Sequence, residues 1–225
     1  MILNVLSIPA AILLILTSTG LLLSTNWRFS IWALSLQYVG VFLLVALSWR
    51  IEMAVAKLLA GWFAGAILGF TLASNFGTYD IERTYRDGEG QARPTGRLFR
   101  IFAIALIWLA VGLLTSSLLK WAPGISLAQI LGGLILIGLG ILHLGLTANP
   151  LRITIGLLTV LGGFEILYAT VEKSTLVAGL LAGVNLALAL AGAYILTVTV
   201  SAQAIIVADD ENLSDIDITI LEKHI

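Results

Sequence analysis

The sequence contains no cysteine and little charge, and each shortage removes a class of protein. Without cysteine, the chain has no disulfide, no iron–sulfur cluster, no thiolate metal site and no cysteine nucleophile. Charged residues make up 11% of the 225 residues, whereas a soluble domain carries about a quarter. Because so few charges cannot cover a water-facing surface, the composition excludes a soluble globular protein.

Histidine and the common catalytic motifs are also scarce. The two histidines, His143 and His224, cannot form a metal cluster together, because one lies in an apolar run and the other in the terminal tail. There is no Walker loop, no dinucleotide fingerprint and no GxSxG elbow. The net charge of −1 gives no basic footprint for nucleic acid. We therefore expect no metal site, no cofactor, no catalytic residue and no nucleic-acid partner.

The chain is instead rich in hydrophobic residues. Hydrophobic residues make up 59% of it, the mean hydropathy is +1.04, and seven apolar segments approach or exceed the roughly 20 residues that cross a bilayer. Open sheet edges are not tolerated in lipid, so these segments must be helices. The sequence predicts an all-α, polytopic membrane protein, a single bundle over residues 1–207. The expected spans are 2–23, 29–48, 53–74, 98–119, 127–147, 153–171 and 175–207.

Loop charges predict the orientation of the bundle. The side that holds Arg28, Arg100, Arg152, Lys223 and the four arginines of the loop at about 75–97 carries eight basic residues, and the other side carries three. Under the positive-inside rule, the amino terminus lies outside and the carboxyl terminus in the cytoplasm, in a multi-pass protein of the inner (plasma) membrane. The acidic cytoplasmic tail, 208–225, alternates isoleucine with polar residues from 215 to 220. This alternation indicates a short strand along a neighbouring protein, or else an unstructured tail.

Small residues recur at a helical spacing in two spans. Gly61, Gly65 and Gly69 follow one another every fourth residue, and Gly179 and Gly183 repeat the spacing in the last span. Such stripes let another backbone approach closely, so we expect both to pack against helices.

Glu165 is the ionisable residue whose predicted depth is least compatible with contact to lipid. It lies roughly 12 Å inside the outer end of its helix, counting from Lys173. A charge there costs at least about 2.5 kcal/mol on insertion scales, so it should face other helices, a partner or water. One interpretation is a protonatable site in an ion path. The alternative is a static ion pair or hydrogen bond with a neighbouring helix.

Three further polar residues are candidates for the same ion path. Lys57 lies roughly 10 Å in from the same side, so it pairs with Glu165 if the two helices adjoin, or else snorkels to the surface. Asn185 lies near the middle of the last span and His143 near the cytoplasmic end of the fifth. Their alternatives are a hydrogen bond between helices for Asn185, as for Gln37 in the second span, and interfacial packing for His143.

The segment that begins NPLRITIG resembles a known family. Its pattern N-x-L-R-x-x-x-G is formed by Asn149, Leu151, Arg152 and Gly156. With the chain length and the number of spans, it resembles component E of the hydrogenase-4 type complexes. That family is related over its last helices to the K subunit of respiratory complex I and to the C subunit of Mrp sodium/proton antiporters. The sequence AVAKLLAGW around Lys57 is similar to a lysine-bearing span of the same family.

This chain departs from the family pattern at two positions. The family has a carboxylate just before the glycine that corresponds to Gly163, where this chain has Leu161 followed by Gly162. Glu165 lies four residues beyond Leu161, one turn further along the same face. The family also has a proline soon after the lysine, near the position of Trp62.

The resemblance implies a subunit without a catalytic centre of its own in a larger oxidoreductase or antiporter complex. It would pack against other, antiporter-like membrane subunits within the bilayer and contribute to a proton or sodium path. The first alternative is a purely structural or assembly protein with a static buried Glu165. A stand-alone small-solute transporter is the second, although the sequence has no inverted repeat and no pair of broken helices.

Overall fold

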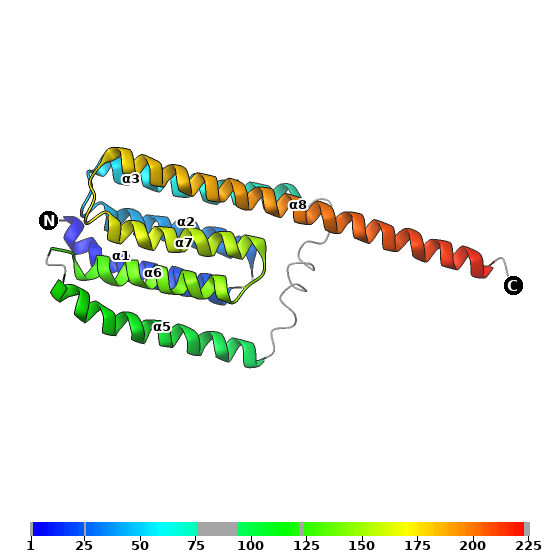
Figure 1. Ribbon diagram of the computed structural model, residues 1–225, viewed down its shortest axis with the longest axis horizontal. Helices are drawn as coiled ribbons and strands as arrows, with labels where there is room; N and C mark the ends of the chain where they lie inside the picture. Colours follow the sequence, from blue (N-terminus) through cyan, green and yellow to red (C-terminus); the bar gives the residue numbers. More distant parts are fainter. Residues whose placement is uncertain (1, 25, 76–93, 122–123, 223–225) are drawn as a thin grey trace.

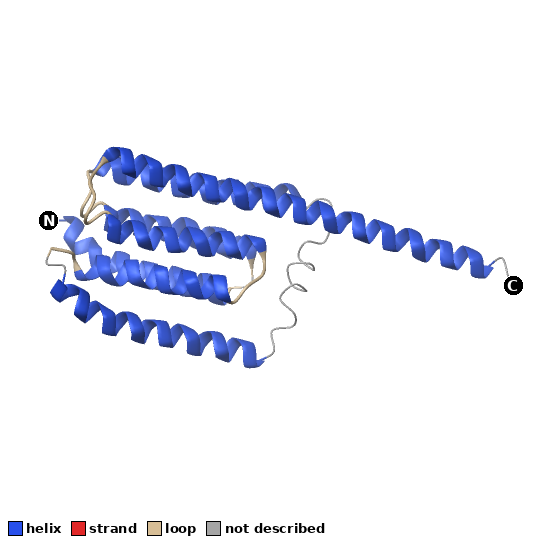
Figure 2. Ribbon diagram, in the orientation of Figure 1, coloured by secondary structure: helices blue, strands red, loops and turns tan. Residues whose placement is uncertain are grey.

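The computed structural model describes residues 2–24, 26–75, 94–121 and 124–222, and it defines side chains over 5–24, 26–74, 98–121 and 124–202. Within these residues every regular element is a helix, and seven helices are long and apolar enough to cross a membrane (Figure 2). They are α1 (Ile2–Leu23), α2 (Trp27–Val45), α3 (Ile51–Asn75), α5 (Pro94–Trp121), α6 (Leu127–Gly145), α7 (Pro150–Tyr168) and α8 (Thr175–Glu222). The predicted all-α architecture with seven spanning helices is confirmed.

The helices form two rows with one helix beside them (Figure 1). One row is α3, α2 and α1, and the other is α8, α7 and α6, so that α3 packs on α8, α2 on α7 and α1 on α6. The helix α5 packs mainly against α6 at the edge of the bundle. This arrangement gives α2 and α7 a neighbour on each side within their row, and the faces that they turn toward each other are shielded from lipid.

Polar caps define where the central helices begin. The Asn26 side chain accepts a hydrogen bond from the backbone N–H of Arg28 at the start of α2, and Asn149 does the same for Leu151 at the start of α7, each at 3.0 Å. Pro150, in the first turn of α7, costs no hydrogen bond because its nitrogen would have no helical partner there. The α7 helix therefore begins three residues before the predicted span, with the asparagine of the NPLR segment as its cap.

Side chains tie the helix ends together on the side predicted to face outside. Trp49 Nε1 donates to the backbone oxygen of Glu172 at 2.7 Å, which joins the α2–α3 turn to the α7–α8 turn. Gln129 Nε2 donates to the Leu44 backbone oxygen at 3.0 Å and to Ser48 Oγ at 2.8 Å, which joins the start of α6 to the end of α2. These bonds fix the vertical register of the two rows.

The carboxyl-terminal tail differs from its prediction. The helix α8 continues through Glu222, so residues 215–220 are helical and neither a strand nor an unstructured tail. The helix extends well past the bundle on the side where α3 ends (Figure 1). Most of the predicted cytoplasmic loop at 75–97 lies outside the described residues.

Candidate functional site

A buried ion pair joins α3 to α7. Lys57 Nζ donates a hydrogen bond to Glu165 Oε1, and the two side chains are 2% and 0% exposed. The alternative that Lys57 snorkels to the membrane surface is therefore wrong. Their contact agrees with the similar membrane depth predicted for the two residues, and it makes them one site.

Two more helices join the ion pair through hydrogen bonds. Asn185 Nδ2, on α8, donates to Glu165 Oε1 at 3.2 Å, and Tyr38 Oη, on α2, donates to Asn185 Oδ1 at 2.9 Å. Asn185 and Tyr38 are also buried. The chain of bonds from Lys57 through Glu165 and Asn185 to Tyr38 thus takes one side chain from each of four helices. We call these four residues the Glu165 cluster.

Gly61 makes room for the tyrosine of this cluster. It lies one turn beyond Lys57 on α3, and a Cβ at this position would stand 2.2 Å from the ring of Tyr38. No other residue type fits without moving that ring. The doubled glycine spacing on α3 therefore admits an aromatic ring from α2, which in turn reaches Asn185.

The second oxygen of the carboxylate is unpaired. Glu165 Oε2 is buried and has no hydrogen-bond partner among the residues that the structure describes. Buried polar atoms are almost always bonded, because leaving one unpaired costs about 1–3 kcal/mol. The cluster therefore binds Oε1 firmly and leaves Oε2 as an acceptor with spare capacity.

A second polar contact lies deeper between α2 and α7. Gln37 Nε2 donates to Thr159 Oγ1 at 3.2 Å, which confirms the predicted hydrogen bond between helices for Gln37. Gln37 Oε1 is buried without a partner in the described part of the chain. Thr159 lies roughly 9 Å from Glu165 along the helix axis. Polar side chains therefore continue from the cluster toward the start of α7.

His143 is not part of the cluster. It is buried on α6, within electrostatic reach of Arg152 on α7 and Arg100 on α5. Its Nε2 has no hydrogen-bond partner among the described residues. Arg152 donates to the backbone oxygen of Ser24 and lies about 20 Å from Glu165 along α7. Of the four predicted ion-path candidates, the structure brings together Glu165, Lys57 and Asn185, and leaves His143 near the opposite end of the bundle.

The two predicted glycine stripes have different surroundings. Gly61, Gly65 and Gly69 face Tyr38, Ser35 and Ile31 of α2. Gly179 and Gly183 are exposed, and a Cβ on either would meet nothing within 4 Å in the described part of the chain. Gly179 and Gly183 therefore pack against no helix in the described part of this chain, and packing of their stripe against a partner helix stays a prediction. The α8 face that packs on α3 and α7 instead carries Asn185, Ala189 and Gly192.

Glycines also bring the backbones of α6 and α7 close together. On α6 and α7, Gly133 lies against Gly163 and Gly140 against Gly156. The two glycines of each helix, Gly133 and Gly140 on α6 and Gly156 and Gly163 on α7, are seven residues or two turns apart, so they return to the same face. Gly156 is also the glycine of the NPLRITIG pattern, and its function in this fold is this contact.

Tyr38 is the member of the cluster that sequence reasoning missed. A tyrosine in an apolar span is ordinary, and only its neighbour Gln37 marked the position as polar. Chemically, the cluster offers one ammonium, one carboxylate, one amide and one phenol in a dry interior. Among the described residues no three His, Asp or Glu side chains gather as metal ligands.

Comparison with known proteins does not assign the chain to a family. No protein-family model, curated protein or solved structure matches this chain. On its own observations, the chain is a multi-pass helical membrane protein with a buried ion pair at the meeting point of four helices.

Proposed function

We propose that this protein is an integral membrane subunit of an ion-translocating complex of the complex I, membrane hydrogenase or Mrp antiporter kind. In this proposal the Glu165 cluster exchanges protons as one step of a proton or sodium path. The proposal rests on the different surroundings of the two oxygens of the Glu165 carboxylate. Oε1 is bonded by Lys57 and Asn185, while Oε2 is buried without a partner among the described residues.

A static ion pair would be built differently. Burying two charges is expensive, and their attraction compensates only when further hydrogen bonds satisfy the remaining lone pairs. Oε2 accepts no such bond from the residues that the structure describes, so these residues alone do not complete a static pair. An unbonded carboxylate oxygen is instead suited to accept a proton or a hydrogen bond from water.

The neighbouring lysine gives the carboxylate a second exchange partner. When a proton moves from Lys57 Nζ to Glu165, the ammonium becomes a neutral amine and the carboxylate a neutral acid. The net charge of the pair is zero before and after this step, so no net charge is created in the low-dielectric interior. Passing this proton on leaves the pair with a net negative charge, so a second proton must reach Lys57 or Glu165 for the pair to become neutral again.

The family resemblance supports the same function. Its two segments are the lysine-bearing span and the helix that follows Asn149, and these supply Lys57 and Glu165. Lys57 lies in the span that the resemblance marks, Glu165 lies one turn beyond the family's carboxylate position, and the two are in direct contact. Antiporter-like membrane subunits are accordingly the proposed partners, with the inner membrane as the location.

One observation favours a second candidate function. The bonds from Tyr38 through Asn185 and Glu165 to Lys57 connect four helices, as expected of an assembly protein in which the ion pair only holds the bundle. In that case, neutralising one charge strands the other and weakens the fold.

Proton or sodium movement by the reconstituted native complex separates the two functions. Glu165→Gln should leave the complex assembled but reduce ion movement, and Glu165→Asp should keep part of it. Glu52→Gln is the matched control, because Glu52 is an exposed carboxylate at the start of α3. Normal ion movement by a fully assembled Glu165→Gln complex would rule out the proposed path, and failure to assemble would favour the structural function.

A further inference from the structure

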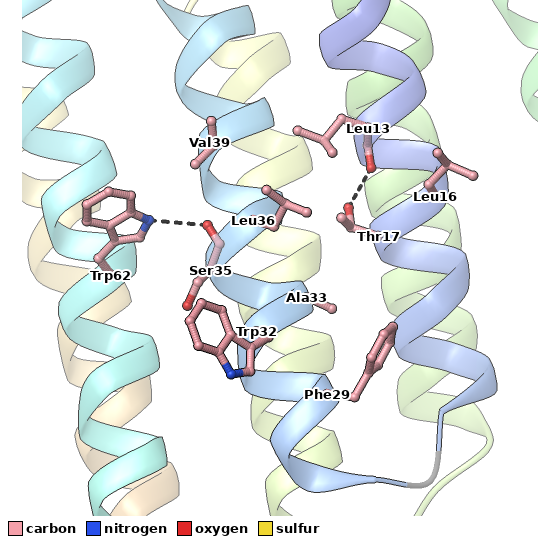
Figure 3. Close-up of a pocket in the computed structure, with 10 residues that line it drawn as sticks. All are labelled: Leu13, Leu16, Thr17, Phe29, Trp32, Ala33, Ser35, Leu36, Val39 and Trp62. Atoms are coloured by element: carbon pink, nitrogen blue, oxygen red, sulfur yellow. Dashed lines mark hydrogen bonds between the residues drawn. The ribbon is translucent and has the colours of Figure 1, made fainter.

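An apolar groove runs along the outer surface of α2. Its volume is about 630 Å³. In the groove, α2 forms the middle, α1 one side, and Trp62 of α3 the other (Figure 3). The lining residues from α2 include Phe29, Trp32, Leu36 and Val39. The groove is remote from the Glu165 cluster, since none of the cluster's four residues lines it.

The polar atoms of the lining are largely occupied by the protein itself. Thr17 Oγ1 donates to the Leu13 backbone oxygen at 2.8 Å, and Ser35 Oγ donates to that of Ile31 at 3.0 Å. Trp62 Nε1 donates to the Ser35 backbone oxygen at 3.2 Å (Figure 3). The surface that remains for an occupant is mainly hydrocarbon, which suits an alkyl chain better than a polar ligand.

The length of the groove matches one leaflet of a bilayer. Phe29 lies in the first turn of α2 and Val39 near its middle, a rise of about 15 Å along the helix. The hydrocarbon core of a bilayer is about 30 Å thick, so one leaflet measures about 15 Å. An acyl chain that enters at the start of α2 would therefore reach the inner end of the groove at the membrane midplane.

A positive charge stands at the entrance. Arg28 is exposed, and its guanidinium carbon lies 5.4 Å from the centre of the Trp27 ring. Trp32, Ser35 and Val39 follow Arg28 at steps of four, three and four residues, so Arg28 shares their face of the helix. It directly precedes Phe29 of the groove lining, at the level predicted for lipid headgroups. Guanidinium groups pair well with phosphate oxygens.

We propose that this groove is a binding site for one anionic phospholipid, with an acyl chain along α2 and its phosphate paired with Arg28. The charge pattern predicts that this end of α2 faces the cytoplasm, where the leaflet holds most of the anionic lipid. The site is independent of the proposed ion path, because it uses different residues on the other side of α2.

Two measurements on the detergent-purified full chain test the site. The first counts phosphatidylglycerol molecules that remain per protein after washing. The second reconstitutes the protein in phosphatidylcholine vesicles with a minor fraction of phosphatidylglycerol that carries a diazirine in its acyl chain, and maps the photo-adducts by mass spectrometry. Arg28→Gln is compared with Arg50→Gln, which removes an exposed arginine from the opposite end of the bundle.

We expect the wild-type and Arg50→Gln proteins to keep the lipid and to carry adducts at Leu16, Leu36 or Trp62. Arg28→Gln should lower the retained lipid and these adducts about fivefold, the effect of one basic residue at a membrane surface. Equal retention by all three proteins, or adducts spread evenly over α5 and α8, would mean ordinary boundary lipid and overturn the proposal. Protection of the groove from labelling in the native complex would assign it instead to a partner helix.

Discussion

Gly163 of α7 lies so close to Gly133 of α6 that a Cβ on Gly163 would stand 2.6 Å from the Gly133 backbone oxygen. The contact repeats two turns away, where a Cβ on Gly140 would stand 3.1 Å from the Gly156 backbone oxygen. In lipid, helices associate through such close packing, because burial of apolar surface contributes little when the solvent is itself apolar. The close packing of α6 on α7 therefore fixes the position of α7, which carries Glu165.

Gly163→Ala should destabilise the protein by about 1–3 kcal/mol, because the added methyl meets backbone atoms that cannot turn away. Gly179→Ala is the matched control, since its methyl meets nothing within 4 Å in the described chain. The control should be neutral or slightly stabilising, as alanine is the better helix former. Unfolding in a denaturing detergent measures both. Equal tolerance of the two substitutions would contradict the packing described for α6 and α7.

Substitutions along the α3 stripe should have graded effects. The nearest atom to an added Cβ is 2.2 Å away at Gly61, 3.2 Å at Gly65 and 3.5 Å at Gly69. Alanine should therefore destabilise the fold most at Gly61, where the Tyr38 ring must move, and least at Gly69. The same unfolding assay gives the order. If Gly61→Ala were the mildest of the three, the position of the Tyr38 ring would be wrong.

Removing one charge of the buried pair should cost more than removing both. Lys57→Met leaves the Glu165 carboxylate without its cation and should destabilise the bundle by about 3–5 kcal/mol. Adding Glu165→Gln to Lys57→Met should restore part of this stability, because the uncompensated charge is gone. A double-mutant cycle on the unfolding free energy measures the coupling. Additive effects of the two substitutions would show that the pair does not interact in the folded protein.

Accessibility of single cysteines should report the orientation. The chain has no native cysteine, so Gly88→Cys and Ser214→Cys each introduce one thiol. On the charge pattern, both lie in the cytoplasm and should resist an impermeant thiol reagent added to intact cells. Opening the cells should allow both to react. Labelling of both from outside would reverse the predicted topology.

The seven spans could be predicted from the sequence because lipid allows few alternatives. Depth could also be predicted, since a fixed rise per residue places Lys57 and Glu165 at similar levels. Lateral neighbours could not be predicted in the same way. His143 and Asn185 were equal candidates by composition, yet only Asn185 faces Glu165, because the order of helices in the two rows decides which faces meet.

The glycine patterns show the same limit. Spacing predicts that small residues share a face, but it does not specify what that face meets, and the stripe of Gly179 and Gly183 turns outward. The prediction for the carboxyl-terminal tail was wrong for another reason. Alternating isoleucine and polar residues suit a strand, whereas the structure continues the long preceding helix through them.

One continuous helix, α8, connects the Glu165 cluster to a segment that extends well past the bundle (Figure 1). Asn185 lies in the bundle and Glu222 at the far end of the same continuous helix, about 55 Å away. Ala189 and Leu196 are buried as well, so the bundle holds α8 beyond Asn185. A tilt of the whole helix by about 5° would still move Glu222 by about 5 Å relative to Asn185, a displacement the size of a side chain.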